Sequence, residues 1–236
     1  MKTQATLSTF VCSAIAAALL TCVSSASTIA LWQLAGQPGN QLTTMGVGSA
    51  NVSALDMTRG SGLGVNTGSG SFNSNGWDGV DANDYISFGF TVDAGYEVKL
   101  ASILLGTRSS NTGPGTLGLY SSIDNFANPI QQFQQTGDAY NDRNLDITAL
   151  GLVSGSVEFR IFEIGDTQAD GSGDTSSAGT FRLTDYSPPG IASTAVSVTG
   201  ELTQISNRVP EGGASFMMLG LALCAIAATR QLISGR

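Results

Sequence analysis

Apolar and polar residues alternate with a period of two in several separate segments, which is the pattern of β-strands with one buried face. The clearest case is segment 85–92, where the apolar residues of one face are Ile86, Phe88, Phe90 and Val92. Segment 155–162 points Val157, Phe159 and Ile161 inward, and Glu158 and Arg160 outward. Segment 194–202 places Val196, Val198 and Leu202 on one face. No sustained 3.6-residue period competes with this pattern between residues 27 and 209.

Shorter segments of strand-like composition bring the expected total to about ten strands, with Gly, Asn, Ser and Asp turns between them. These segments are 29–34, 53–58, 97–105, 116–121, 130–133, 144–147 and 180–184. The pattern predicts an all-β fold, a single antiparallel, jelly-roll-like β-sandwich over residues 27–208. Segment 36–84 is dense in Gly, Ser and Asn. Phe72 and Trp77 within it favour a long loop folded back on the sandwich over a flexible linker.

The N-terminal segment has the layout of a secretory signal peptide. Lys2 provides a positive start, an apolar run covers residues 10–23, and small residues follow at Ser24-Ser25-Ala26. Cleavage is expected between Ala26 and Ser27, so that residues 1–26 are removed. An uncleaved anchor helix is the alternative, but the apolar run is short for a membrane span.

The C-terminal segment, residues 209–236, has three parts in a fixed order. A short motif comes first and reads Val209, Pro210, Glu211, Gly212 and Gly213. An apolar helix is predicted over 214–228, about 22 Å long and shorter than a hydrocarbon core of about 30 Å. Arg230 and Arg236 would keep the tail on the cytoplasmic side. A plain membrane anchor explains the helix and the arginines but not the motif.

This tail resembles the PEP-CTERM class of bacterial C-terminal sorting signals, in the variant group whose motif begins Val-Pro-acid. The resemblance implies an exosortase-type membrane protease as a partner, next to signal peptidase. It also implies a transient inner-membrane anchor, followed by delivery to the cell envelope, cell surface or extracellular matrix. The order of short motifs in the body, from Ile29-Ala30-Leu31-Trp32 to Leu119-Tyr120-Ser121-Ser122, looks like the exported sandwich domains found ahead of such tails. Those domains mostly have no assigned activity, which implies a surface or matrix component.

Composition excludes several function classes. The chain of 236 residues has no histidine, and its three cysteines, Cys12, Cys22 and Cys224, lie in the terminal segments. A disulfide, a Cys/His metal cluster and a Ser-His-Asp triad are therefore excluded for the body. Residues 27–209 hold seven basic and seventeen acidic side chains, a net charge of −10. Such a body repels phosphates, so nucleic acid is not an expected partner.

The most metal-like segment is the acidic loop that contains Asp166, Asp170 and Asp174 together with Gly171 and Gly173. Oxygen-only ligands suit calcium, and glycines let a loop wrap around an ion. The loop lacks EF-hand spacing, and Asp and Gly also form ordinary turns between strands, which is the favoured interpretation. No cofactor is predicted apart from this calcium alternative. A second acidic loop, with Asp78, Asp81 and Asp84, allows the same two interpretations.

No catalytic residue is nominated. The glutamates are expected on solvated strand faces, and they are Glu97, Glu158, Glu163 and Glu201. Arg108 is expected to pair with a carboxylate inside the sandwich. Trp32 and Trp77 are expected in the core rather than stacked on a sugar.

The leading hypothesis is a non-enzymatic exported protein of the bacterial envelope or extracellular matrix, sorted through its C-terminal signal. The alternative is a carbohydrate-binding module, with or without calcium, whose partner would be an extracellular polysaccharide. A planar row of exposed aromatic side chains or an open acidic pocket on one sheet would favour that alternative. A carboxylate-based glycosidase is a third hypothesis, and it requires two facing acids in a cleft.

Overall fold

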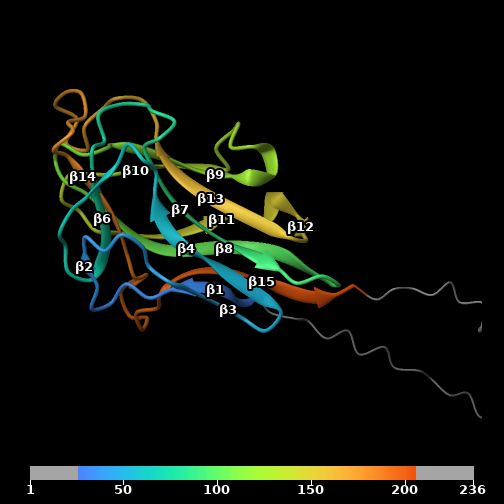
Figure 1. Ribbon diagram of the computed structural model, residues 1–236. Coiled ribbons are helices and arrows are strands. Elements are labelled where there is room, and N and C mark those ends of the chain that lie inside the picture. Colours follow the sequence, from blue (N-terminus) through green and yellow to red (C-terminus); the bar gives the residue numbers. More distant parts are fainter. Residues whose placement is uncertain (1–25, 206–236) are drawn as a thin grey trace, which may run out of the picture.

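The computed structural model describes residues 26–205 and consists of two packed β-sheets (Figure 1). The all-β class and the sandwich are confirmed over this range. The predicted signal peptide, except for Ala26, and the whole predicted sorting signal lie outside the described residues. Within residues 26–205, no helix has the length and apolar character needed to cross a membrane.

The larger sheet has ten strands in the order β2-β6-β14-β8-β15-β1-β3, with β11 and β12 also paired to β8 and β5 paired to β6. Its strands are β1 (Ser27–Trp32), β2 (Pro38–Gly39), β3 (Gly46–Gly48), β5 (Gly64–Val65), β6 (Ser71–Asn75), β8 (Tyr96–Ser109), β11 (Asn141–Asp146), β12 (Leu152–Val153), β14 (Thr180–Thr184) and β15 (Val196–Gln204). All pairings in it are antiparallel except that of β2 with β6.

The smaller sheet has five antiparallel strands in the order β10-β9-β13-β7-β4. Its strands are β4 (Val52–Arg59), β7 (Tyr85–Val92), β9 (Thr116–Ser121), β10 (Gln131–Gln134) and β13 (Ser156–Glu163). Two short 3₁₀ turns, η1 (Ser122–Asp124) and η2 (Thr148–Leu150), lie between strands.

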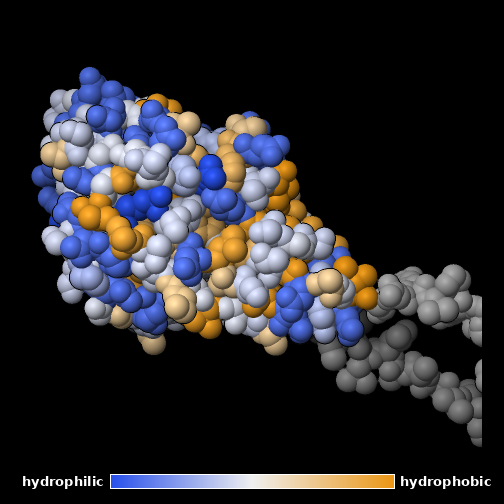
Figure 2. All heavy atoms as spheres, in the orientation of Figure 1, coloured by the Kyte–Doolittle hydropathy of each residue, from blue (hydrophilic) through white to orange (hydrophobic). Residues whose placement is uncertain are grey.

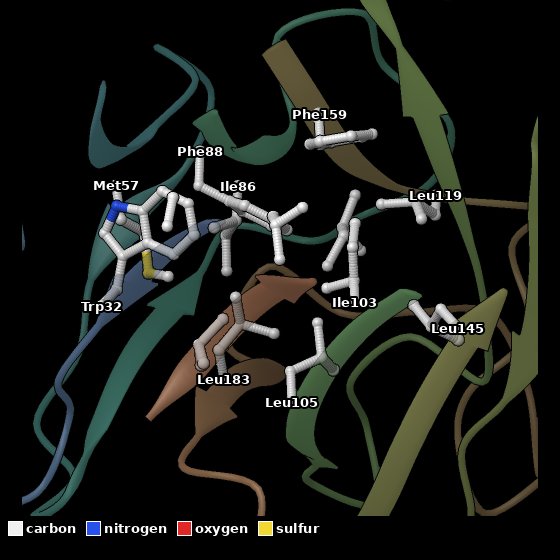
Figure 3. Close-up of a cluster of buried hydrophobic side chains, with 14 of the residues drawn as sticks. Trp32, Met57, Ile86, Phe88, Ile103, Leu105, Leu119, Leu145, Phe159 and Leu183 are labelled. Atoms are coloured by element: carbon white, nitrogen blue, oxygen red, sulfur yellow. The ribbon is translucent and has the colours of Figure 1, made fainter. Parts of the chain in front are cut away.

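The core fills the space between the two sheets, as the sequence alternation predicts (Figure 3). The Trp32 ring meets Phe88 edge-on at a centroid distance of 5.2 Å, and Phe88 lies 5.9 Å from Phe159. The Trp32 indole N–H donates to the Leu55 carbonyl oxygen at 2.8 Å, which satisfies its polar atom inside the core. Trp32 and Trp77 are both fully buried, so the expectation that they are core residues is confirmed.

The glycine-rich segment 36–84 is more regular than the sequence suggested. It contributes five strands, β2 to β6, and β6 lies inside the larger sheet between β2 and β14. Polar residues occupy buried positions of β6, where Asn73 donates to the Thr67 carbonyl oxygen and Ser74 accepts from Arg59. Because these polar residues replace apolar ones, β6 has no period-two pattern, and the expectation of a long loop was wrong.

Arg59 holds this segment on the sandwich. Its guanidinium donates to the carbonyl oxygens of Gly39, Gln41 and Asn73 and to the Ser74 hydroxyl. The same group lies 3.6 Å above the centroid of the Phe72 ring. Burial lowers the pKa of Arg59 to about 10. One side chain of β4 thereby ties loop 37–44 to β6.

Both ends of the described chain lie at one end of the sandwich (Figure 1 and Figure 2). Ser27 of β1 pairs with Gly200 of β15, and the Ile205 amide donates to the Gly95 carbonyl oxygen, in the turn that follows β7. Tyr85 and Glu163, at the other ends of β7 and β13, therefore lie at the end of the sandwich away from both chain termini.

We expect Phe159→Ala to destabilise the full-length chain by about 3–5 kcal/mol, because the ring is fully buried and packs on Phe88 and Phe90. Urea unfolding followed by tryptophan fluorescence measures the change. The control is Leu152→Ala at an exposed position of β12, which should change stability by less than about 0.5 kcal/mol. Similar losses for the two variants would contradict the assignment of Phe159 to the core.

Candidate functional site

A hollow of about 460 Å³ lies beside the outward row of β13, at the end of the smaller sheet away from the termini. We call it the aromatic cleft, and the residues that define it are Tyr120, Phe126, Arg160 and Phe162. Asp81 and Glu163 also line it. The cleft combines ring faces with hydrogen-bonding groups, which is the composition of a site for a ligand that is partly apolar and partly polar.

The aromatic rings come from neighbouring strands and support one another. The Phe162 ring of β13 lies 5.2 Å from the Tyr120 ring of β9, at an interplanar angle of 85°, and 5.3 Å from the Tyr85 ring of β7. Gly118, opposite Phe162 in the β9–β13 pair, leaves room for this arrangement. A Cβ at Gly118 would lie 2.7 Å from the Ile164 Cδ1 and 2.8 Å from the Tyr120 Cε2. Packing on these strands therefore fixes the rings in place.

Arg160 joins the sheet to the segment that follows η1. Its guanidinium carbon lies 4.2 Å from the centroid of the Tyr85 ring and 4.0 Å from that of Phe126. Its Nε donates to the Glu158 carboxylate at 2.7 Å. The guanidinium is thus already in contact with two aromatic rings while its Nε is held in an ion pair. The arrangement fixes Phe126 as a wall of the cleft.

Glu163 is buried, with only 3% of its surface exposed, and neither carboxylate oxygen accepts a hydrogen bond of normal geometry. Burial raises its pKa to about 7, and the negative charges of Asp166 and Asp84 add to the rise. The Thr175 hydroxyl and the Gly79 amide lower the pKa of Glu163 and so offset part of this rise. The expectation of a solvated Glu163 was wrong, because this residue continues the inward row of Val157, Phe159 and Ile161 at the end of β13.

A second hollow, of about 420 Å³, adjoins the aromatic cleft, since Asp81 lines both. We call it the acidic hollow, and its carboxylates are Asp78, Asp81 and Asp84. Asp84 is 4% exposed, and burial followed by the charges of Asp81 and Asp78 raises its pKa to about 6. The three acids of the second predicted acidic loop therefore line one hollow, with Asp84 buried.

The structure does not bring together the three aspartates of the first predicted acidic loop. Asp166 Oδ1 accepts hydrogen bonds from the Thr175 amide at 3.1 Å and hydroxyl at 2.5 Å, and Asp170 Oδ1 accepts from the Ser172 amide at 2.9 Å. Asp174 is exposed. Across residues 26–205, no group of three or more acidic side chains is placed to hold a metal ion. Asp166, Asp170 and Asp174 do not converge, because the first two carboxylates accept hydrogen bonds within their own loop.

The remaining predicted residues have varied positions. Arg108 forms an ion pair with Asp138 at 2.5 Å, at the surface rather than inside the sandwich, so that expectation was wrong in its location. Ala26 is exposed, and Ser27 is the first residue of β1. The sorting motif Val209–Gly213 lies beyond the part of the chain that the structure describes.

The aromatic cleft was not predicted, although the sequence contains a signal for it. Tyr85 and Phe162 are register partners, as are Tyr120 and Arg160. In the alternating pattern all four occupy outward positions, where a solvated strand face normally has polar residues. Aromatic residues at such positions on three neighbouring strands indicate a functional surface, but the strand order that brings them together was not available from the sequence.

No family model matches the chain, and no curated protein matches it. Among solved structures, a chain described as carbohydrate binding module family 29 is similar with a TM-score of 0.39 and 10% sequence identity. The match covers 75% of this chain and 90% of that chain. A TM-score this low does not show a shared fold.

We expect Glu163→Gln to flatten the pH dependence of stability. The carboxyl group has a higher pKa in the folded chain (about 7) than its ordinary 4.5. Its contribution to the free energy of unfolding is therefore complete below pH 4.5 and is lost as the pH rises through 7. The amide imitates the protonated acid, so the variant should be more stable than the wild type at pH 8 and similar to it at pH 4.5. Urea midpoints of the full-length chain at four pH values measure the difference.

The matched control for this experiment is Glu201→Gln, the same substitution at a half-exposed position of β15, measured at the same pH values. If Glu163→Gln were destabilising by the same amount at every pH, the side chain would be ionised in the folded protein, contrary to the assignment.

Proposed function

We propose that this chain is an exported, non-enzymatic envelope or matrix protein whose jelly-roll-like sandwich binds extracellular polysaccharide in the aromatic cleft. The observation that carries the proposal is the cleft itself, where Tyr120, Phe126 and Phe162 lie around Arg160. Pyranose rings have apolar faces that pack on aromatic side chains and hydroxyl groups that need polar partners. The cleft offers both.

Binding is favoured over glycoside hydrolysis by the state of Glu163. A retaining or inverting glycosidase needs two carboxyl groups that reach the scissile bond. Both Glu163 oxygens are closed off from solvent, so a bound sugar would not reach them. The raised pKa of Glu163 is thus a property of its burial, and no catalytic role is proposed for it.

The proposed export and sorting depend on the terminal segments, for which the evidence is the sequence alone. The signal-peptide layout ending at Ala26 and the Val209–Gly213 motif ahead of an apolar run support this part of the proposal. The position of the cleft agrees with it, because the cleft lies at the end of the sandwich away from both termini. A protein attached through its C-terminal segment would present this end outward.

We expect Phe162→Ala to weaken polysaccharide binding by about tenfold or more, which corresponds to about 1.4 kcal/mol, because the ring supplies a stacking surface in the cleft. A glycan array with the full-length chain identifies ligands, and calorimetry then compares variants. The control is Tyr140→Ala, which removes an exposed aromatic ring that does not line the cleft. Equal loss in both variants, or none in Phe162→Ala, would contradict the assignment of the cleft.

We expect the native protein to begin at Ser27 and to lack the apolar segment that follows Val209–Gly213. Mass spectrometry of the mature termini, together with fractionation of the producing cells, measures both. An intact C-terminal tail retained in the inner membrane would contradict the sorting proposal but leave the binding proposal open to its own test.

A further inference from the structure

A second polar surface lies on the outer face of the larger sheet, whereas the aromatic cleft lies on the smaller sheet. Asn73 of β6, Arg182 of β14 and Arg108 of β8 are register partners on three adjacent strands. Phe181 and Leu183 flank Arg182 along β14 and belong to the core. Because side chains alternate along a strand, Arg182 points away from the core. We call Arg108 and Arg182 the arginine pair.

The segment before β6 covers one side of Arg182. A Cβ at Gly68 would lie 3.0 Å from the Arg182 Nη1 and 3.1 Å from the Asn73 Nδ2. Asn73 is fully buried and donates to the Thr67 carbonyl oxygen at 2.7 Å. The Arg182 side chain is therefore bounded on this side by packed backbone, while residue 182 as a whole stays partly exposed.

The segment before β11 positions the other arginine. Arg108 forms an ion pair with Asp138, and its Nε donates to the Asp138 carbonyl oxygen at 3.1 Å. The guanidinium carbon also lies 5.2 Å from the centroid of the Tyr140 ring. Tyr96, at the start of β8, pairs with Gln204 near the chain terminus. The arginine pair, at the other end of β8, therefore lies at the same end of the sandwich as the aromatic cleft.

Arg182 differs from the other arginines of residues 26–205 in its contacts. Each of the others donates a side-chain hydrogen bond, and they are Arg59, Arg108, Arg143 and Arg160. Over the same residues the Arg182 side chain forms neither a hydrogen bond nor an ion pair, and its Nε is buried without an acceptor. Burial and the charge of Arg108 both lower the pKa of Arg182. A partly buried cation of this kind is stabilised when an anion approaches it.

The charges of the arginine pair are only partly neutralised. Like charges on register partners destabilise a sheet, and Asp138 supplies one negative charge for the two guanidinium groups. The pair therefore keeps positive charge on a body whose net charge is −10 over residues 27–209. Because a body of this charge repels anions, a bound anion needs a local positive surface, and the arginine pair provides one.

We infer that the polysaccharide is acidic and that the arginine pair binds its carboxylate groups. The inference rests on the proposed function for the class of ligand and adds a second binding surface to it. Guanidinium groups have a planar fork of donors that matches the two oxygens of a carboxylate. The cleft and the pair lie on different sheets, so each holds its own stretch of the polymer. Two such contacts on one molecule strengthen attachment through effective concentration.

The experiment compares tetragalacturonate with its methyl ester, in which the same rings carry no charge, by calorimetry with the full-length chain at pH 7. We expect the acid form to bind at least tenfold more tightly, because only this form supplies carboxylates. Arg182→Gln should reduce the preference to less than threefold, and Arg182→Lys, which keeps the charge, should retain more of it. The control is Lys99→Gln, an exposed base nine residues from Arg108 along β8, which should leave the preference unchanged. Urea midpoints check that each variant is folded.

The outcomes separate this inference from the proposed function. Equal binding of the acid and the ester, with loss of both in Phe162→Ala, would overturn the acidic ligand and leave carbohydrate binding in the cleft. A tenfold preference that persists in Arg182→Gln would place the anion site elsewhere and would also overturn the inference. So would a hexaglutamate peptide that binds as tightly as tetragalacturonate, because the pair would then be a general carboxylate surface. No binding of any glycan would overturn both proposals.

Discussion

The pleat of β13 is the constraint on which the rest of the structure depends. Its inward row, Val157, Phe159 and Ile161, builds the middle of the core. Its outward row supplies Arg160 and Phe162 to the aromatic cleft. Because side chains alternate strictly, a slip of one residue in the pairing with β7 and β9 would exchange the two rows and destroy core and cleft together. The register of one strand therefore sets both stability and the proposed binding surface.

The sequence pattern was a good guide wherever a strand has one apolar and one polar face. Segments 85–92, 116–121 and 180–184 match β7, β9 and β14 residue for residue. The pattern failed for β6, where Ser71, Asn73 and Ser74 are buried. Ser71 and Asn73 donate hydrogen bonds to loop carbonyl oxygens, and Ser74 accepts one from Arg59. The alternation pattern of a single segment does not show such hydrogen-bond partners, because they come from other parts of the chain.

The candidate site was predictable in part. The acids at 78–84 were noted as a loop, and the structure gathers them in one hollow. Glu163 was misplaced because the strand was taken to end at Phe162, where one further residue falls on the buried row. The aromatic cleft depends on β9 lying beside β13 and on β13 lying beside β7, which is a non-local arrangement. Composition along a single segment does not reveal which aromatic residues become neighbours.

Arg59 has a further consequence for a protein of this composition. Its hydrogen bonds go to three carbonyl oxygens and a hydroxyl group, none of which changes charge between acid and alkaline conditions. The guanidinium itself, with a pKa of about 10, stays charged through the neutral range. The attachment of loop 37–44 is therefore independent of the titration of the many carboxyl groups, and ionic strength acts on it only weakly. This part of the scaffold keeps its shape while acidity and salt change.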